Sequence, residues 1–274
     1  MKYVSVITPT LNSSRFVEDT MRTVAMQREN GIGVQHLIID GGSTDTTSSI
    51  VATYAHPDTT FIVEKDNGPT EAINRGLSMA NGEFLCWLNS DDAYAPNALS
   101  RAVAKLERHP NASFCFGHCP IIDETNREIR KTITLVKELC FPISCRFSIR
   151  TLNYISQPAM VFRKSAFLNA GPLRTDMYAA WDYEFILRLW KYGRGVHLGN
   201  PNMAFFRWTP SSISGRGFKK QFEEELNCVI NDAGKFALST SLHRAVCRFI
   251  VFCYNRMTKP DKTSNERAAG REML

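Results

Sequence analysis

Two adjacent carboxylates follow a short apolar segment in the first half of the chain. Residues 84–88 are apolar throughout, and Asn89-Ser90-Asp91-Asp92 comes directly after them. Neighbouring carboxylates repel each other, and a divalent cation relieves that repulsion when phosphate oxygens complete its coordination shell. Acidic residues are also common at the start of a helix, and residues 96–99 suggest one. The segment therefore predicts either a metal site or a helix start.

Polar groups follow two other strand-like segments in the same half of the chain. They are Thr8-Pro9-Thr10-Leu11-Asn12 and Asp40-Gly41-Gly42-Ser43. If the strands are parallel, these ends meet the Asp91 segment at one edge, where open α/β sheets bind ligands. Asp40 can accept a hydrogen bond from a base or a ribose, and the glycines let the backbone approach a ligand. Because no glycine-rich phosphate loop is present, phosphate charge falls mainly to a cation at Asp91.

Alternating strand and helix patterns must position these segments. Strand-like segments cover 4–8, 34–39, 60–64, 84–88 and 112–117, and helix-like segments cover 13–27, 43–54, 70–79 and 98–107. This alternation predicts an α/β fold with a parallel, crossover-connected sheet. Further along, we expect an edge strand at 131–135, a returning strand at 157–162, and helices at 182–192, 219–229 and 242–253.

The composition is that of a folded globular protein. The chain has 274 residues, 43% of them hydrophobic, which suits one large domain with a tail. No apolar run reaches the roughly 18 to 20 residues that span a bilayer, and no leader peptide is evident. Eight cysteines without a secretory signal favour reduced thiols and a cytoplasmic location. Cys115 and Cys119 have zinc-like spacing but no second pair follows, so we expect buried, small apolar side chains there.

The net charge is +6, and the end of the chain contributes much of it. From Leu242 to Leu274, seven basic residues stand against three acidic ones. This excess suggests an anionic partner, but not nucleic acid, because no nucleic-acid-binding signature accompanies it. A helical stripe in this part carries Leu242, Ala245, Val246, Phe249, Ile250 and Cys253. Such a helix makes peripheral contact with an anionic membrane or packs on the rest of the protein.

Six blocks of sequence, in the correct order, resemble glycosyltransferase family 2. They lie at 4–12, 39–45, 66–76, 80–83, 88–92 and 182–189, so the resemblance spans about residues 2–215. It implies the GT-A fold, an α/β architecture whose mixed, mostly parallel central sheet is flanked by helices, here with a helical C-terminal extension. It also implies inverting transfer from a nucleotide-sugar donor, with Mn²⁺ or Mg²⁺, to a saccharide or lipid-linked acceptor in polysaccharide or glycolipid biosynthesis.

The resemblance also suggests how the chain is divided. Residues 1–218 would form the GT-A domain, with a nucleotide-sugar-binding half at 1–117 and an acceptor-binding half at 118–218. Residues 219–258 would form the C-terminal helical extension. The polar segment 259–274 would be a flexible tail.

Carried over by position, the resemblance assigns a donor site. The residues that would line the nucleotide-sugar are Pro9, Thr10, Asp40, Asn74, Asn89 and Ser90. Asp91 would take the metal-ligand role of the family's DxD-type motif, and Asp92 would either help it or cap a helix. Asn89 stands where many members have the first Asp, so fewer carboxylates hold the metal and the diphosphate completes its shell.

Asp182 resembles the family's catalytic base, which accepts the proton of the acceptor hydroxyl. Its alternative role is that of a helix N-cap. Trp181 precedes it where many members have an acidic residue, so we expect an apolar wall on which a sugar or lipid-linked acceptor stacks. Gln157 would touch the donor sugar or the acceptor, or would only start a strand.

Trp208 stands where relatives often have a histidine, in a segment that begins Phe206-Arg207. If that histidine binds metal or pyrophosphate in relatives, this chain must use Arg207, Lys219 or its main chain instead. Arg207 would also touch the sugar or the acceptor.

Two other functions compete with a glycosyltransferase. The first is a catalytically inactive GT-A-fold protein that binds a nucleotide or a partner, which the missing Asp and His favour and the presence of Asp40, Asp91 and Asp182 opposes. The second is a nucleotidyltransferase, which lacks support because the basic glycine-rich N-terminal loop is missing. The leading prediction is a metal-dependent enzyme in the cytoplasm, at the inner face of the membrane.

Overall fold

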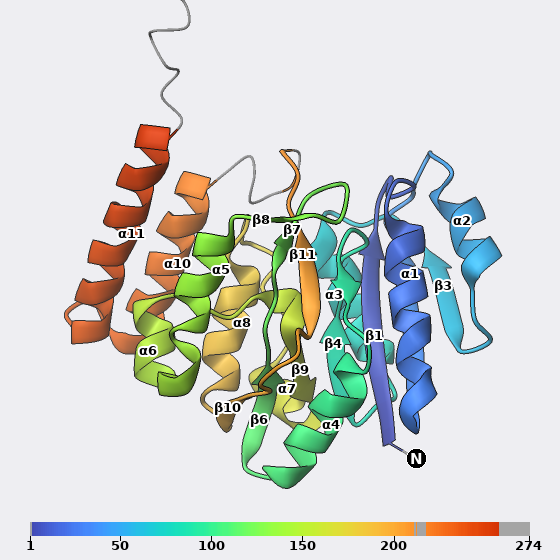
Figure 1. Cartoon of the computed structure of the whole chain (residues 1–274), viewed down its shortest axis with the longest axis horizontal. Helices are drawn as coiled ribbons and strands as arrows, with labels where there is room; N and C mark the ends of the chain where they lie inside the picture. Colours follow the sequence, from blue (N-terminus) through green and yellow to red (C-terminus); the bar gives the residue numbers. More distant parts are fainter. Residues whose placement is uncertain (1, 211, 213–217, 258–274) are drawn as a thin grey trace, which may run out of the picture.

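A seven-stranded sheet forms the centre of the protein in the computed structural model, which describes residues 2–210, 212 and 218–257 (Figure 1). From one edge to the other, its strands are β10 (Arg194–His197), β6 (Ala112–Phe116), β9 (Met160–Arg163), β4 (Phe84–Trp87), β1 (Lys2–Thr10), β2 (Ile32–Asp40) and β3 (Thr59–Val63). All neighbours run parallel except β9, which is antiparallel to β4 and β6. The sheet is therefore mixed and mostly parallel, as expected.

A second, four-stranded sheet lies beside the carboxyl end of β4. Its strands, in order, are β5 (Ala93–Tyr94), β11 (Ala204–Arg207), β7 (Ile121–Ile122) and β8 (Glu128–Ile129). Strand β11 pairs with β5 on one side and with β7 on the other. This pairing brings the segment around Arg207 next to the residues that follow Asp92.

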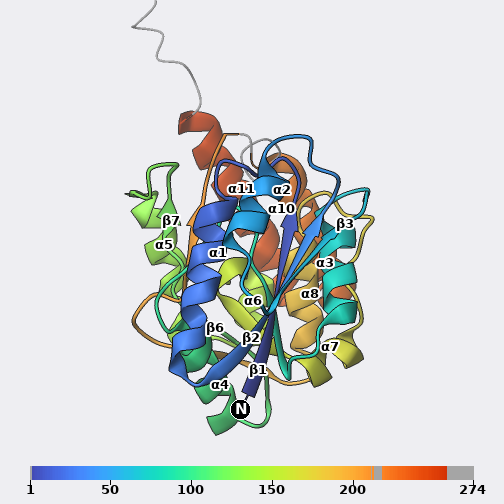
Figure 2. The same ribbon diagram turned by 90° about the vertical axis from the view of Figure 1, so that its right-hand side faces the viewer.

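Helices cover both faces of the large sheet (Figure 2). They are α1 (Val17–Ala25), α2 (Thr47–Tyr54), α3 (Pro69–Met79), α4 (Ala98–Arg108), α5 (Lys131–Glu138), α6 (Arg146–Thr151), α7 (Lys164–Ala170), α8 (Trp181–Leu189), α10 (Phe218–Ala233) and α11 (Leu238–Met257). Short 3-10 helices lie at Met26–Asn30, Phe141–Ile143 and Gln157–Ala159. Helices α3, α7 and α8 pack on one face with Ile7 and Leu37, whereas α4 packs on the other face with Val4 and Val6.

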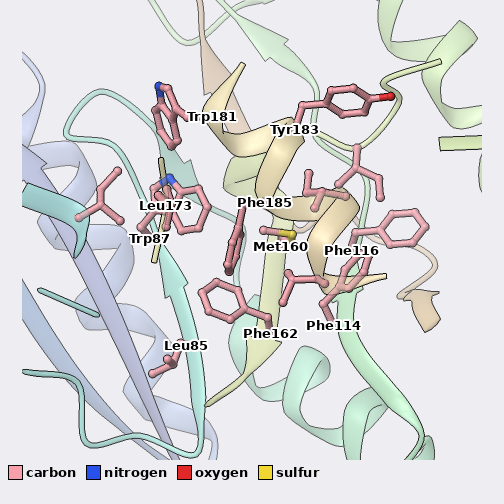
Figure 3. Close-up of a cluster of buried hydrophobic side chains, with 14 of the residues drawn as sticks. Leu85, Trp87, Phe114, Phe116, Met160, Phe162, Leu173, Trp181, Tyr183 and Phe185 are labelled. Carbon is pink, nitrogen blue, oxygen red and sulfur yellow. The ribbon is translucent and has the colours of Figure 1, made fainter. Parts of the chain in front are cut away.

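The core beneath α8 is rich in aromatic side chains (Figure 3). The rings of Phe162 and Phe185 lie 5.2 Å apart at 74°, and those of Trp87 and Phe185 lie 5.9 Å apart. Burying a Phe side chain contributes roughly 1.5–3 kcal/mol. This cluster therefore fixes the position of α8 against the end of β4.

Most predicted elements are confirmed, with shifted boundaries, but two are corrected. Residues 131–135 were expected to form an edge strand, and they lie instead in helix α5. Thr132, Ile133 and Thr134 are β-branched and favour a strand locally, but β-propensity is weak evidence where tertiary packing decides. In the expected strand 157–162, residues 157–159 form a 3-10 turn and only the rest belongs to β9. Cys115 and Cys119 are buried thiols, as expected.

The last two described helices form a hairpin that packs against α8 and α6. The predicted helix at 242–253 is confirmed, but its buried face carries His243 and Cys247, while Leu242, Ala245 and Phe249 of the predicted stripe are exposed. The side chain of Cys253 and the tail 259–274 lie outside the described residues. None of the described helices is long and apolar enough to cross a membrane.

Candidate active site

The carboxyl ends of β1, β2 and β4 meet at one edge of the large sheet, as the sequence predicts. The register pairs Thr10 with Asp40 and Ile7 with Trp87. The Thr10 hydroxyl donates a hydrogen bond of 2.8 Å to Asp40 Oδ1, so two of the predicted site residues touch. Pro9 lies beside them, buried in β1. Three loops far apart in sequence therefore share one rim.

Hydrogen bonds within the protein occupy the Asp40 carboxylate. Besides the Thr10 hydroxyl, it accepts the Ser43 hydroxyl at 2.5 Å and the backbone N–H groups of Gly42 and Ser43 at 3.1 and 2.7 Å. The residue is fully buried. The sequence suggested a contact with base or ribose, whereas in the structure Asp40 shapes the turn that follows β2.

The loops after the three strands are joined by further hydrogen bonds. The Asn12 N–H donates to Ser43 Oγ at 2.8 Å, and the Thr44 N–H donates to Asn12 Oδ1 at 2.9 Å. The hydroxyls of Ser13 and Ser90 lie 2.8 Å apart. Because these bonds link all three loops, the rim is held in one shape before any ligand arrives.

Asp66, which follows β3, also belongs to this edge and was not assigned a role from the sequence. A Cβ atom at Gly41 would lie 2.9 Å from Asp66 Oδ2, so only glycine allows this approach. Asp66 Oδ1 accepts a hydrogen bond of 2.9 Å from the Gly68 N–H. The signal in the sequence was the family block at 66–76, which begins shortly after β3 ends.

The Asn74 side chain, predicted to line the nucleotide-sugar, is held by two hydrogen bonds within the protein. Its Nδ2 donates to the carbonyl of Leu173 and its Oδ1 accepts the N–H of the same residue, both at 2.8 Å. This pair of bonds ties α3 to the segment that leads into α8. The residue therefore has a positioning role in the structure.

Asp91 and Asp92 differ sharply in their surroundings. Asp92 is fully buried; its Oδ1 accepts the Arg207 N–H at 2.9 Å and its Oδ2 accepts Asn89 Nδ2 at 3.1 Å. Asp91 is half-buried, and no other residue that the structure describes donates a hydrogen bond to its carboxylate. Within the Asp91–Asp92 pair, it is therefore Asp91 whose carboxylate oxygens no donor of any other described residue occupies.

The alternative role of these acids as a helix cap is wrong. Helix α4 begins at Ala98, and Asn97 is its N-cap. Burial raises the pKa of Asp91, against the positive charge of Arg207. The pKa of Asp92 is raised well above its usual range by burial and then by the neighbouring Asp91 charge. A cation at Asp91 would relieve this repulsion.

Arg207 lies beneath the Asp91 loop, and its side chain is 1% exposed. Its Nε donates to the Asp91 carbonyl at 2.8 Å and its Nη1 to the Asp123 carbonyl at 3.0 Å. The guanidinium also lies 4.5 Å from the ring centre of Phe16. The predicted contact of Arg207 with sugar or acceptor does not fit this burial, and the residue instead supports the loop.

Trp208 follows Arg207 and carries a cation on its ring. The Arg130 guanidinium lies 3.8 Å from the ring centre, a close cation–π contact. The sequence named Arg207 and Lys219 as replacements for a missing histidine, and it did not point to Arg130. Arg130 is a different, half-buried cation. The ring on which it lies, Trp208, follows Arg207, whose N–H group binds Asp92.

Asp182 lies in the first turn of α8, one residue beyond the start of the helix at Trp181. The N-cap is Ala180, so the alternative that Asp182 caps the helix is wrong. The segment that leads into α8 is instead held by α10, where the Glu224 carboxylate accepts the N–H groups of Tyr178, Ala179 and Ala180 at 2.8, 2.8 and 3.0 Å. This arrangement leaves Asp182 available for chemistry.

Burial raises the pKa of Asp182 to about 6, although the Tyr183 N–H and the charge of Lys137 oppose the shift. A carboxylate with a pKa near neutral is suited to take up a proton. The Glu225 carboxyl is a second acid near it: burial raises its pKa to about 7, and the Asp182 charge adds to that shift. Sequence reasoning missed Glu225, since nothing in its helix marks it.

Packing of two tryptophans joins the strand that leads to Asp91 to the helix that carries Asp182. The rings of Trp87, at the end of β4, and Trp181, at the start of α8, lie 5.8 Å apart (Figure 3). Trp181 packs against Trp87 and is 7% exposed, so little of its ring is left as the apolar wall predicted for the acceptor. Gln157 is buried and donates to the Trp87 carbonyl at 2.7 Å, which fixes the same strand end.

Comparisons with known proteins agree with this architecture. Residues 5–169 match the family model described as glycosyl transferase family 2. An uncharacterized glycosyltransferase of Haemophilus influenzae is 24% identical over 188 residues, which cover 68% of this chain and 61% of that protein. A PGL/p-HBAD biosynthesis glycosyltransferase of Mycobacterium bovis is 28% identical over 194 residues, covering 65% of this chain and 67% of that protein.

Solved structures show the same fold. S. aureus TarS in complex with UDP-GlcNAc superposes with a TM-score of 0.67 at 19% identity, covering 85% of this chain and 66% of that one. The mannosyltransferase PcManGT of Pyrobaculum calidifontis, in complex with GDP-Man and Mn²⁺, superposes with a TM-score of 0.60 at 17% identity. The match covers 98% of this chain and 79% of that one. The chain thus spans about two thirds or less of the first relatives' length and has a GT-A fold. It belongs to glycosyltransferase family 2.

Proposed function

We propose that this protein transfers a sugar from a nucleotide-diphosphate donor to a hydroxyl group of a saccharide or lipid-linked acceptor, with inversion at the anomeric carbon. The observation that carries the proposal is the contact between Trp87 and Trp181. It holds the Asp91 loop beside the helix turn that carries Asp182. A donor-binding carboxylate and a proton acceptor therefore face one region at the sheet edge.

The donor would bind at the rim formed by the β1, β2 and β4 ends. The two solved relatives contain UDP-GlcNAc and GDP-Man, which supports a nucleotide-sugar as the class of donor. Within the rim, Thr10, Ser90 and Asp66 offer polar side chains or close backbone approach around Gly41. We propose that Asp40 and Asn74 preform the site through their internal hydrogen bonds.

A divalent cation, Mn²⁺ or Mg²⁺, fits the Asp91 carboxylate. Hard cations prefer oxygen ligands, and Mg²⁺ commonly binds through one or two carboxylates together with substrate phosphates. Asp91 supplies such oxygens, whereas both oxygens of Asp92 accept hydrogen bonds from the protein. We assign Asp91 as the metal ligand and Asp92 as its support. When bound, the ion would neutralise charge on the diphosphate.

Asp182 would act as the general base. The acceptor oxygen forms a bond to the anomeric carbon, the bond from that carbon to the diphosphate oxygen breaks, and the hydroxyl proton passes to Asp182. A positioned base contributes roughly 10²–10⁴-fold to such a step. The raised pKa of this carboxyl and its place in the first turn of α8 support the role.

Arg130 is a candidate partner for the diphosphate. Its guanidinium rests on Trp208, which follows the Arg207 backbone that supports Asp92. Arginine is well suited to phosphate because its planar fork of donors matches the oxygens. This residue would take the place that relatives give to a histidine.

Peripheral membrane contact through α11 is part of the proposal. Phe236, Leu238, Leu242 and Phe249 are between 39% and 92% exposed, and Arg248 is exposed beside them. Apolar side chains next to basic ones suit the cytoplasmic face of an anionic membrane, where a lipid-linked acceptor would lie. The location at that face rests on this pattern.

The proposal is tested by thermal shift and turnover. The purified chain is heated with UDP-, GDP- and dTDP-sugars, each with Mn²⁺, Mg²⁺ or chelator, because a ligand that binds only the folded state raises the midpoint. We expect one nucleotide series to shift the midpoint only with metal and to be slowly hydrolysed. Binding without any hydrolysis or transfer would favour the inactive binding protein instead.

A further inference from the structure

A cluster of three buried ligand-type side chains lies between α10 and α11. Glu225 comes from α10, and His243 and Cys247 come from α11, where they are four residues apart and so share one face. One ligand atom from each residue lies within 4.8 Å of the other two. The side chains are 3%, 1% and 8% exposed.

The histidine at the centre of this cluster has no well-formed hydrogen bond. Both His243 ring nitrogens are buried and neither reaches a donor or acceptor of the described residues with hydrogen-bond geometry, although the backbone of Arg150 and Thr151 lies near enough to affect the pKa of the ring. A buried polar group without a partner is costly, by roughly 1–3 kcal/mol. The Glu225 carboxylate is not close enough to pair with the ring, since no ion pair or hydrogen bond joins the two within the described part of the chain. The ring therefore calls for another group between them.

The surrounding residues hold these side chains in place. The His243 ring stacks on Tyr183 with centres 5.9 Å apart and planes at 12°, and the Tyr183 hydroxyl donates to the Ile149 carbonyl at 2.7 Å. Glu225 Oε1 accepts hydrogen bonds of 3.1 Å from Asn153 and Gln221. Such outer contacts are typical of metal sites, where they orient the ligands.

We propose that Glu225, His243 and Cys247 bind one Zn²⁺ ion that fastens α11 to α10. Imidazole, thiolate and carboxylate form a ligand set that zinc accepts, and the thiolate disfavours Mg²⁺ or Ca²⁺. In a tetrahedral zinc site the ligand atoms lie roughly 3.3–3.8 Å apart, and the three atoms here lie within 4.8 Å of one another.

A water molecule can supply the fourth ligand. The Asn153 side chain lies beside the cluster, because its Nδ2 donates to Glu225, and its buried Oδ1 has no hydrogen-bond partner among the described residues. This site is separate from the proposed donor metal, which would bind at Asp91 on the sheet edge.

The ion would act on the architecture of the active site. Glu225 is the neighbour of Glu224, which binds the backbone of the segment that leads into α8 and Asp182. Fixing Glu225 to α11 would restrain the helix that makes this contact. A structural zinc site adds to the free energy of unfolding, because the ion binds the folded chain.

The test uses the full-length protein, first stripped with chelator and then dialysed against Zn²⁺ or Co²⁺. We expect stoichiometric zinc after dialysis, a higher thermal midpoint with zinc than with chelator, and a thiolate-to-cobalt absorption band with Co²⁺. In Cys247→Ser the band should disappear and zinc affinity should fall at least about 100-fold, since loss of even an outer partner costs 10–100-fold. Glu225→Gln should also weaken binding.

Two controls make the result specific. Cys228→Ser removes another buried thiol of α10, one turn from Glu225 and outside the cluster, and should keep the band. Asp91→Ala should keep it as well, which separates this site from the donor metal. A wild-type protein without the cobalt band, or a band that persists in Cys247→Ser, would overturn the proposal. The cobalt band and zinc content of the wild-type protein test the proposal even if a variant does not fold.

Discussion

The single residue on which the proposed chemistry depends most is Asp182. We expect Asp182→Asn to lower kcat by roughly 10²–10⁴-fold while donor binding is retained, because the amide cannot take up the acceptor proton. The variant should be at least as stable as the wild type at pH 8, since it removes a buried charge whose pKa is raised. Initial rates, donor titration and thermal midpoints measure this. Undiminished turnover would rule out the base.

The same carboxyl predicts the pH dependence of transfer. Its pKa is raised to about 6, so it is protonated below that value and able to accept a proton above it. We expect kcat/KM to fall about tenfold per pH unit below pH 6 and to level off above it. A rate profile from pH 5 to 8 at saturating metal shows the inflection. A flat profile across this range would contradict the assignment.

Asp91 should control the metal dependence of donor binding. In Asp91→Ala we expect nucleotide-sugar affinity with Mn²⁺ to fall at least about tenfold, because no remaining free carboxylate takes its position. Binding in chelator should be unchanged. Asp58→Ala, an exposed acid before β3, serves as the matched control and should behave like the wild type. Titrations with and without chelator that agree in the wild type would argue against a metal role.

At the scale of elements, the contact between α10 and the start of α8 is the clearest target. We expect Glu224→Gln to lower the free energy of unfolding by about 1–3 kcal/mol, because three backbone N–H groups lose a charged acceptor. Glu223→Gln, the exposed neighbour on the same helix, should change it by less than about 0.5 kcal/mol. Denaturant unfolding of both variants makes the comparison.

The pH dependence of this stability has a defined sign. Burial tends to raise the pKa of Glu224, but the N–H groups of Ala179, Tyr178 and Ala180 outweigh it and the pKa is lowered. A lowered pKa means that the stabilisation is present above the usual glutamate pKa and is lost as the pH falls through the lowered value. The difference between wild type and Glu224→Gln should therefore shrink in acid.

Elements also show where sequence patterns mislead. Residues 131–135 include three successive β-branched residues and were predicted as an edge strand, but they lie in helix α5. In α11 the apolar stripe was expected either to meet a membrane or to pack on the protein, and the face that packs carries His243 and Cys247 instead. Periodicity identifies a helix and its faces, but it does not say which neighbour exists to cover each face.

At the scale of the whole molecule, the exposed side of α11 predicts membrane binding. We expect the protein to co-sediment with vesicles that contain anionic lipid and to be released by salt, since basic and apolar side chains act together. A Phe236→Ser and Phe249→Ser double variant should have about tenfold lower affinity for these vesicles, which is a loss of roughly 1.4 kcal/mol in binding free energy.

Leu168→Ser provides the control, because Leu168 is as exposed as Phe249 but lies on α7. Equal sedimentation of the double variant and the wild type would leave the α11 surface without a membrane role.

The sequence by itself determined the family blocks, the α/β class, the strand ends that carry Thr10, Asp40 and Asp91, and the position of Asp182 at a helix start. These features depend on residue types and hydrophobic periodicity within short segments, which can be recognised without knowing the rest of the fold. Six ordered blocks were sufficient for the fold, and the match over residues 5–169 confirms the family.

Only the tertiary structure decided which polar side chains are free. From the sequence, Asp40, Asp92 and Asn74 are candidate ligand-binding side chains just as Asp91 is. In the structure, their side-chain oxygens accept hydrogen bonds from residues far along the chain. The same holds for the antiparallel β9, and for Glu225, which meets His243 and Cys247 only after the hairpin folds. A side chain's availability is set by long-range hydrogen bonding and burial, and neither is encoded in local spacing.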